Sequence, residues 1–160
     1  MKTTLQYDLQ SVCLDAPKSS NVGNIRRDAT TKNAVSRIIH VPRRFVSEEW
    51  GGTETVVLET CRQQQLAGSN PVIYTSMALA SKKEEIIHGV PVQRFDYSYP
   101  FFGLSADDRN ALDKKGGNLL SLPLFKALLT APDVRLFHAH TLKRVGGSVR
   151  TAARLRKKPL

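Results

Sequence analysis

Apolar residues along the chain fall into short β-branched runs and longer helical repeats, separated by polar stretches. The short runs have the length of strands, and they predict four strands, at residues 38–41, 71–76, 90–95 and 134–139. The longer segments carry apolar residues about four positions apart, as helices do, and they predict helices at residues 53–67, 118–130 and 148–158. This alternation indicates an α/β fold with a Rossmann-like, doubly wound parallel sheet.

The connections between these elements differ in character. Residues 77–88 predict a polar connection, and residues 96–117 predict a long irregular loop, a kind of segment that is often functional. Pro91 lies inside the third strand and predicts an edge position, because proline donates no hydrogen bond to a neighbouring strand. Pro159 and Leu160 stand where a fifth strand would start.

Residues 1–36 differ from the rest in composition. They are rich in polar residues, and their apolar residues show no period. We therefore expect a flexible N-terminal extension followed by one domain at residues 37–160. No apolar run reaches the ~20 residues of a membrane span, and the N-terminus lacks the apolar core of a signal peptide. A cytoplasmic location is expected.

A glycine pair opens the first predicted helix. Without Cβ atoms, Gly51 and Gly52 can take positive φ and let another molecule approach the backbone closely. The unpaired N–H groups of the first helical turn, with the helix dipole, would face that molecule, and a phosphate or diphosphate suits such a place. A plain turn with a glycine N-cap before Thr53 explains the pair as well, and both interpretations stay open.

Positive charge gathers near the C-terminus. Residues 141–160 contain seven basic residues and no acidic one, which is +7 of the formal net charge of +10. Such charge can serve phosphates, an anionic membrane surface or nucleic acid, or it can be a solvated helix face. No helix-turn-helix, zinc or RNA-sheet signature accompanies it, so nucleic acid is not an expected partner.

Two histidines end the fourth strand. His138 and His140 are two positions apart, so on a strand both would point to the same face. A metal would need further ligands, for which only Glu48 and Glu49 were candidates, and no metal is expected. His138 is predicted to pack within the sheet, whereas His140, at the carboxyl end of the strand, is placed to meet a ligand.

The remaining histidines and the cysteines suggest no chemistry. His40 ends the first strand and is predicted to be structural, and His88 in a turn is predicted to be solvated. Cys13 and Cys61 have no metal-ligand spacing and are expected to be reduced, with Cys61 packed on the first helix.

The order of elements and three motifs resemble a known family. The motifs are GGTE at residues 51–54, VRLFHAHT at residues 134–141 and the basic helix ending RLRKKP at residues 154–159. Together they resemble the N-terminal domain of retaining glycosyltransferases with the GT-B fold, of the family-4 (group 1) type that uses nucleotide-sugar donors. The resemblance covers roughly residues 37–160.

The resemblance implies transfer of a sugar from a nucleotide diphosphate to an acceptor hydroxyl, with retained configuration. The family's glycine loop approaches the donor diphosphate, which assigns this role to Gly51, Gly52 and Thr53. The second histidine of the HxH motif lies beside the transferring sugar, and this position is His140, the candidate catalytic residue. Neutral imidazole there donates or accepts a hydrogen bond.

The resemblance also implies partners. The acceptor would be a sugar or a lipid-linked molecule, with peripheral contact to an anionic membrane. No cofactor or metal is expected, since GT-B enzymes generally neutralise the diphosphate with protein cations and helix dipoles. The acceptor-side candidates are Tyr97, Tyr99, Phe101, Phe102 and Arg144.

One departure from the family is large. The family builds most of its donor site in a second, C-terminal domain that this sequence does not include. We therefore expect a truncated N-terminal domain of a GT-B fold, which is inactive in transfer by itself and whose fourth strand is an exposed edge.

Two other functions compete with this interpretation. A nicotinamide-dependent dehydrogenase needs a tight G-x-G-x-x-G turn after the first strand. Here residues 43–50 separate that strand from the glycines, and the third glycine is missing. A non-catalytic module could instead bind an anionic membrane or nucleic acid through the basic C-terminal helix.

Overall fold

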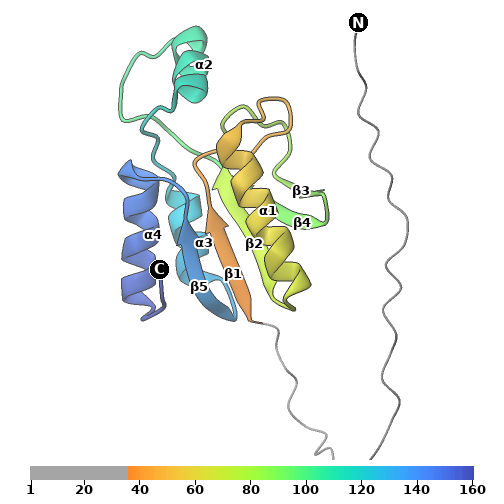
Figure 1. Ribbon diagram of the computed structural model, residues 1–160. Helices are drawn as coiled ribbons and strands as arrows, with labels where there is room; N and C mark the ends of the chain where they lie inside the picture. Colours follow the sequence, from red (N-terminus) through yellow and green to blue (C-terminus); the bar gives the residue numbers. More distant parts are fainter. Residues whose placement is uncertain (1–35) are drawn as a thin grey trace, which may run out of the picture. The chain divides into compact units, whose positions relative to one another are not determined.

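The computed structural model describes residues 36–160, and the extension expected at residues 1–36 lies outside the described residues except for Ser36. This part is an α/β structure (Figure 1). Its strands are β1 (Arg37–Val41), β2 (Asn70–Ser76), β3 (Glu84–Ile87), β4 (Val90–Phe95) and β5 (Val134–Ala139). Its helices are α1 (Gly52–Leu66), α2 (Ala106–Lys115), α3 (Leu122–Thr130) and α4 (Lys143–Leu155).

The strands form one sheet in the order β3-β4-β2-β1-β5. Strands β4, β2, β1 and β5 are parallel, as in Rossmann-like proteins, whereas β3 runs antiparallel to β4. The sheet is therefore mixed rather than wholly parallel. β5 forms the other edge of the sheet, as predicted for the strand at residues 134–139.

β3 corrects two predictions. Part of the polar connection at residues 77–88 is a strand, and β4 is not at the edge of the sheet. Pro91 is tolerated in β4 because the pairing with β2 begins only at Val92, so that Pro91 faces a strand partner on the β3 side alone.

One face of the sheet is covered by α1. Val57, Leu58 and Cys61 are buried there in a cluster that includes Ile73 of β2. The helix ends as its sequence predicts, since Gly68 follows it with φ of 78°. Cys61 is a free, fully buried thiol, and burial raises its pKa to about 12, as expected for a packed small hydrophobe.

The other face packs against α3 and α4 and holds the larger core. Ile39, Val41 and Phe137 point into it from β1 and β5. The contributions from the helices are Leu124, Leu128, Val145, Val149, Ala152 and Ala153. Helix α4 begins five residues before the predicted start, so the glycine pair at 146–147 lies inside it rather than before it. Helix α3 begins at Leu122, four residues later than predicted, with Pro123 in its first turn.

A helix also replaces part of the expected irregular loop at residues 96–117. Helix α2 starts at a Ser105 N-cap and ends at Gly116 with φ of 85°. Its buried Asp113 accepts hydrogen bonds from the hydroxyls of Tyr97 and Tyr99, at 2.5 and 2.8 Å. These two tyrosines therefore tie α2 to the domain.

Among the described residues 36–160, no helix is both long and apolar enough to cross a membrane.

Candidate functional site

The connections on the two sides of β1 diverge. Helix α1 carries the chain from β1 to β2 on one side of β1, while β5 lies on its other side. Open α/β sheets bind ligands in the crevice outside the carboxyl ends of such neighbouring strands. The segments that follow β1 and β5, with the N-terminus of α1, therefore define the place to examine.

A cavity of about 400 Å³ lies there. Its walls are the segment after β1, the start of α1, the C-terminal end of α2 and the segment after β5. It brings together Gly51, Gly52 and Thr53 with His140, the residues that the sequence assigned to one site. Its remaining lining residues are Arg43, Arg44, Glu54, Lys114, Lys115, Gly116 and Thr141.

The glycine pair leaves the start of α1 open, although not through positive φ. Gly51 is the N-cap in extended conformation, with φ of −144°, and no side chain caps the helix. A Cβ at Gly52 would meet no heavy atom within 4 Å. The pair therefore does not use the positive φ that glycine permits, and the room for a close approach comes from the missing side chains.

Among the described residues that line the cavity, Glu54 is the one carboxylate. It is 5% exposed, and its Oε2 lies 3.2 Å from where a Cβ would stand on Gly51. The Nε of Arg44 lies 3.5 Å from the Glu54 Oε1. The cavity wall therefore contains one carboxylate, which is already paired with Arg44, and four cationic side chains. These are Arg43, Arg44, Lys114 and Lys115, so the cavity has an excess of positive charge.

Arg43 and Arg44 follow β1 directly, and the neighbouring strand fixes the backbone around them. The Thr75 hydroxyl donates to the Pro42 carbonyl at 3.0 Å, and the Ser76 hydroxyl donates to the Arg43 carbonyl at 2.6 Å. The backbone that carries the two arginines is thus held at the carboxyl end of the sheet. The two arginines were not among the predicted site residues, although a basic pair one residue after a buried strand is a readable signal.

These arginines have unused donors. The Nη1 atoms of Arg43 and Arg44 are buried and find no hydrogen-bond partner within the part of the chain that the structure describes. Arg43 uses its Nη2 to donate to the Asp113 carbonyl of α2 at 2.8 Å. Burial, and then the neighbouring Arg44, lower the pKa of Arg43. Buried donors without partners are rare in native proteins.

Three histidines meet beside this cavity. His40 of β1 is fully buried and pairs in register with His138 of β5. The Nδ1 of His40 lies 2.9 Å from the Nε2 of His140, and the Nε2 of His40 lies 2.8 Å from the Gln64 Oε1. The sequence predicted that His138 packs within the sheet and that His40 is structural, but it did not predict that the two meet His140.

The surroundings keep the imidazoles of His40 and His140 neutral. Burial, followed by the nearby His138 and His40, lowers the pKa of His140 to about 4. Burial also lowers the pKa of His40, against the hydrogen bond to Gln64, which raises it. At neutral pH His40 and His140 therefore offer hydrogen bonds and lone pairs, while the positive charge of the cavity comes from arginine and lysine.

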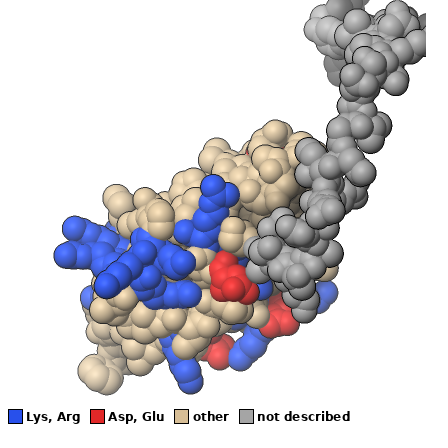
Figure 2. All heavy atoms as spheres, turned by 90° about the horizontal axis from the view of Figure 1, so that it is seen from below, with Lys and Arg blue, Asp and Glu red and all other residues tan. Residues whose placement is uncertain are grey.

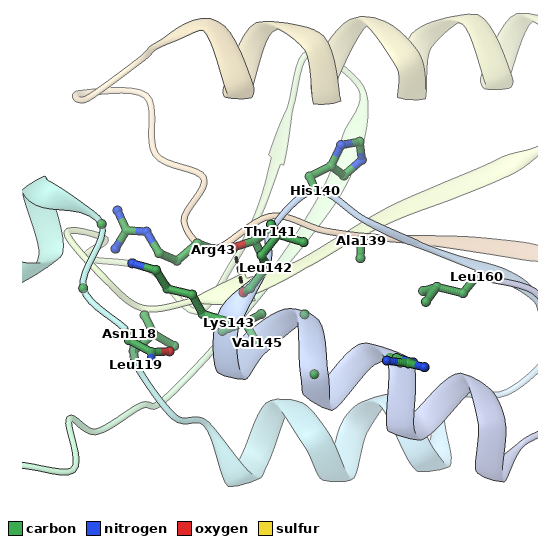
Figure 3. A pocket seen from close by; sticks show the side chains of 15 residues that line it. Arg43, Asn118, Leu119, Ala139, His140, Thr141, Leu142, Lys143, Val145 and Leu160 are labelled. Carbon is green, nitrogen blue, oxygen red and sulfur yellow. Dashed lines mark hydrogen bonds between the residues drawn. The ribbon is translucent and has the colours of Figure 1, made fainter.

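A larger cavity of about 890 Å³ lies on the α4 side of β5 (Figure 3). Arg43, Ala139, Lys143 and Leu160 line it, and the His140 ring points away from it, toward α1. Leu160 lies there because the Phe137 N–H of β5 donates a hydrogen bond to the carbonyl of Pro159. The chain therefore returns to β5 at Pro159, where the sequence predicted the start of a further strand.

The acceptor-side candidates lie elsewhere. Tyr97 and Tyr99 are engaged with Asp113, while Phe101 and Phe102 are 57% and 106% exposed. None of the four lines either cavity. Arg144 lies on α4, where its Nη1 donates to the Asn118 carbonyl at 2.6 Å. The structure thus joins the predicted diphosphate residues to His140 but does not add the aromatic residues or Arg144 to them.

The fold and this crevice define an α/β protein of Rossmann-like arrangement with a cationic cavity at the carboxyl edge of its sheet. Comparisons with protein-family models, with curated protein sequences and with solved structures find no match to this chain.

Proposed function

We propose that residues 36–160 bind the diphosphate of a nucleotide-sugar donor, as the N-terminal, acceptor-side half of a retaining glycosyltransferase of the GT-B type. The single observation that carries this proposal is the pair of unpartnered, buried Nη1 atoms of Arg43 and Arg44 beside the open start of α1. A diphosphate would satisfy both donors and would relieve the repulsion between two adjacent guanidinium groups.

The helix adds to this attraction. No side chain caps the helix at Gly51, and within the described residues no heavy atom lies within 4 Å of where a Cβ would stand on Gly52, so the N–H groups of the first turn of α1 face the cavity. The positive end of the helix dipole favours an anion at that point. Lys114 and Lys115, at the end of α2, contribute charge from the opposite wall.

His140 would act on the sugar rather than on the diphosphate. Since the Gln64 Oε1 accepts from the Nε2–H of His40, the His40 Nδ1 is an acceptor, and the Nε2–H of His140 donates to it. This leaves the Nδ1 of His140 free to accept a hydrogen bond from a sugar hydroxyl. The larger cavity is then the better candidate for the acceptor than the aromatic loop, because none of the loop's four aromatic candidates lines either cavity.

The test is calorimetric titration of the full chain, in buffer with EDTA, with UDP, GDP and ADP and with the matching nucleosides. At least one diphosphate is expected to bind, and its nucleoside to bind at least tenfold more weakly. Gly52→Val is expected to lower diphosphate affinity at least tenfold, about 1.4 kcal/mol, without loss of stability, because the added side chain has room in the empty protein.

A basic surface elsewhere supplies the control. Figure 2 shows Lys and Arg gathered on the side where α4 lies, and exposed residues of this region include Arg150, Arg154, Lys157 and Lys158. If the chain is only a basic module for anionic surfaces, Arg154→Glu should weaken diphosphate binding and Gly52→Val should not. That result would reject the proposal, as would NADH binding more tightly than every nucleoside diphosphate.

A further inference from the structure

The histidine cluster has a geometry that diphosphate binding does not require. His40, His138 and His140 each offer one ring nitrogen, and these three nitrogens all lie within 4.8 Å of one another. Two of the residues are register partners on adjacent strands, and the third follows β5 directly. The backbone of the sheet therefore holds all three, and a loop need not fold around an ion to assemble them.

Gln64 of α1 completes the arrangement. Its Oε1 can only accept, so the Nε2 of His40 carries the proton and the Nδ1 lone pair points at the other two rings. Metal-binding histidines usually donate their second N–H to an oxygen in this way, which fixes the tautomer and the orientation of the ring. Gln64 therefore fixes the tautomer of His40 that leaves the Nδ1 lone pair available.

We propose that His40, His138 and His140 bind a single Zn²⁺ ion, with Gln64 orienting His40 from α1. Zinc takes nitrogen ligands at about 2.0–2.1 Å in tetrahedral geometry, which places ligand nitrogens roughly 3.3 Å apart. The His40 Nδ1 and His140 Nε2 stand at 2.9 Å already. The ring nitrogen of the half-buried His138 lies within 4.8 Å of both.

Binding of the ion changes the tautomer of His140. The proton on the His140 Nε2 moves to its Nδ1 when the ion takes the place of the His40–His140 hydrogen bond. Three histidines leave the fourth position of a tetrahedron open, as in zinc sites that accept water or a substrate oxygen. Since His140 also lines the cavity of about 400 Å³, that open position borders the cationic crevice.

The carboxylates considered from the sequence are not needed. Glu49 is paired with Lys114, its Oε1 lying 3.7 Å from the Nζ, and Glu48 is exposed. The donor set is three imidazole nitrogens, which suits Zn²⁺ and its neighbours Co²⁺, Ni²⁺ and Cu²⁺ better than Mg²⁺ or Ca²⁺.

The experiment titrates the metal-free full chain with Zn²⁺ by calorimetry and with Co²⁺ by visible absorption, in the absence of nucleotides. One equivalent of Zn²⁺ is expected to bind, and Co²⁺ is expected to give the intense visible bands of a tetrahedral site. His138→Asn and His140→Asn should each weaken Zn²⁺ binding more than Gln64→Leu, for which a loss of about 10–100-fold is expected.

The chain offers a matched control. The chain has four histidines, and His88 is the one outside the cluster. It is exposed in a turn with φ of 47°, a backbone conformation that asparagine tolerates. His88→Asn is expected to leave Zn²⁺ affinity unchanged, and so is Cys13→Ser. Because His40 is fully buried, His40→Asn risks unfolding the protein, and the two half-buried positions carry the test instead.

Absence of stoichiometric Zn²⁺ binding would overturn the proposal. So would unchanged affinity in both His138→Asn and His140→Asn, or a loss in His88→Asn or Cys13→Ser as large as theirs. Diphosphate binding is measured with EDTA and zinc binding without nucleotide, so each proposal can fail while the other stands.

Discussion

The two faces of the sheet differ in what they bury. Under α3 and α4 the buried residues are apolar or aromatic, from Ile39 and Val41 of β1 to Phe137 of β5. Under α1 the apolar cluster is smaller, and beside it stand His40, buried, and His138, half-buried. The same two strands supply both faces, since neighbouring residues of a strand point in opposite directions.

This difference separates stability from chemistry within single strands. Phe137 and His138 are adjacent in the chain, yet one fills the core and the other joins a polar cluster. Because side chains alternate between the two faces of a strand, one short strand can contribute to the core on one face and to a polar cluster on the other. This requires that the core face is covered by well-packed helices. The core under α3 and α4 should carry most of the stability, and the face under α1 most of the ligand binding.

The largest expected effect tests the core directly. Phe137→Ala should lower the free energy of unfolding by about 3–5 kcal/mol, because the side chain is fully buried and leaves a cavity. Leu136→Ala, on the other face of β5 and half-buried, should cost only ~1–2 kcal/mol. Urea unfolding of both variants measures the difference, and equal losses would break the contrast between the faces.

A smaller effect is expected where α4 meets the sheet. A Cβ on Gly146 would stand 2.3 Å from the Thr141 carbonyl oxygen, whereas one on Gly147 meets nothing within 4 Å. Gly146→Ala should therefore destabilise by about 1–3 kcal/mol, and Gly147→Ala should stabilise by about 0.5–1 kcal/mol. Thermal unfolding compares the pair. An unchanged melting temperature in Gly146→Ala would mean that α4 does not pack closely against the backbone at Thr141.

The smallest effect concerns the polar face and its pH dependence. The pKa of His140 is about 4 in the folded protein against 6.5 for an ordinary histidine, so the unfolded chain binds more protons between these values. The neutral ring's contribution to stability is complete above pH 6.5 and is lost as the pH falls toward 4. After allowance for the partial exposure of the ring, the loss is about 1–2 kcal/mol.

Urea unfolding between pH 7 and pH 4.5, in EDTA, measures this slope. His140→Gln should flatten it, and His88→Asn should keep it, while contributions from carboxylates are common to all three proteins. An unchanged slope in His140→Gln would show that the polar face does not hold this histidine in its neutral form.

Much of the fold follows from the hydrophobic pattern. Four strands and α1 appear at or within a residue or so of their predicted places, because buried runs with clear ends leave little choice. Helix α2 was missed since its sequence, ADDRNALDKK, has no apolar stripe, and the Ser105 cap and buried Asp113 hold it instead. The early start of α4 was missed because a glycine pair ordinarily ends or precedes a helix, whereas Gly146 here permits a close contact.

The site was only partly predictable. Gly51, Gly52, Thr53 and His140 could be grouped because each stands at an element's end on the carboxyl side of the sheet. The pairing of His40 with His138 depends on the register between two strands far apart in the chain, which composition does not encode. Lys114 and Lys115 enter the cavity only because α2 exists, and α2 was not foreseen.

The strand order also has a consequence for synthesis. β1 is made first but lies between β2 and β5, and the partners His40 and His140 are separated by 100 residues. At ~5–20 residues per second on the ribosome, one edge of the nascent β1 stays unpaired for roughly 5–20 s. During that interval the emerging chain is a candidate for chaperone capture, and the two halves of the crevice come into being at different times.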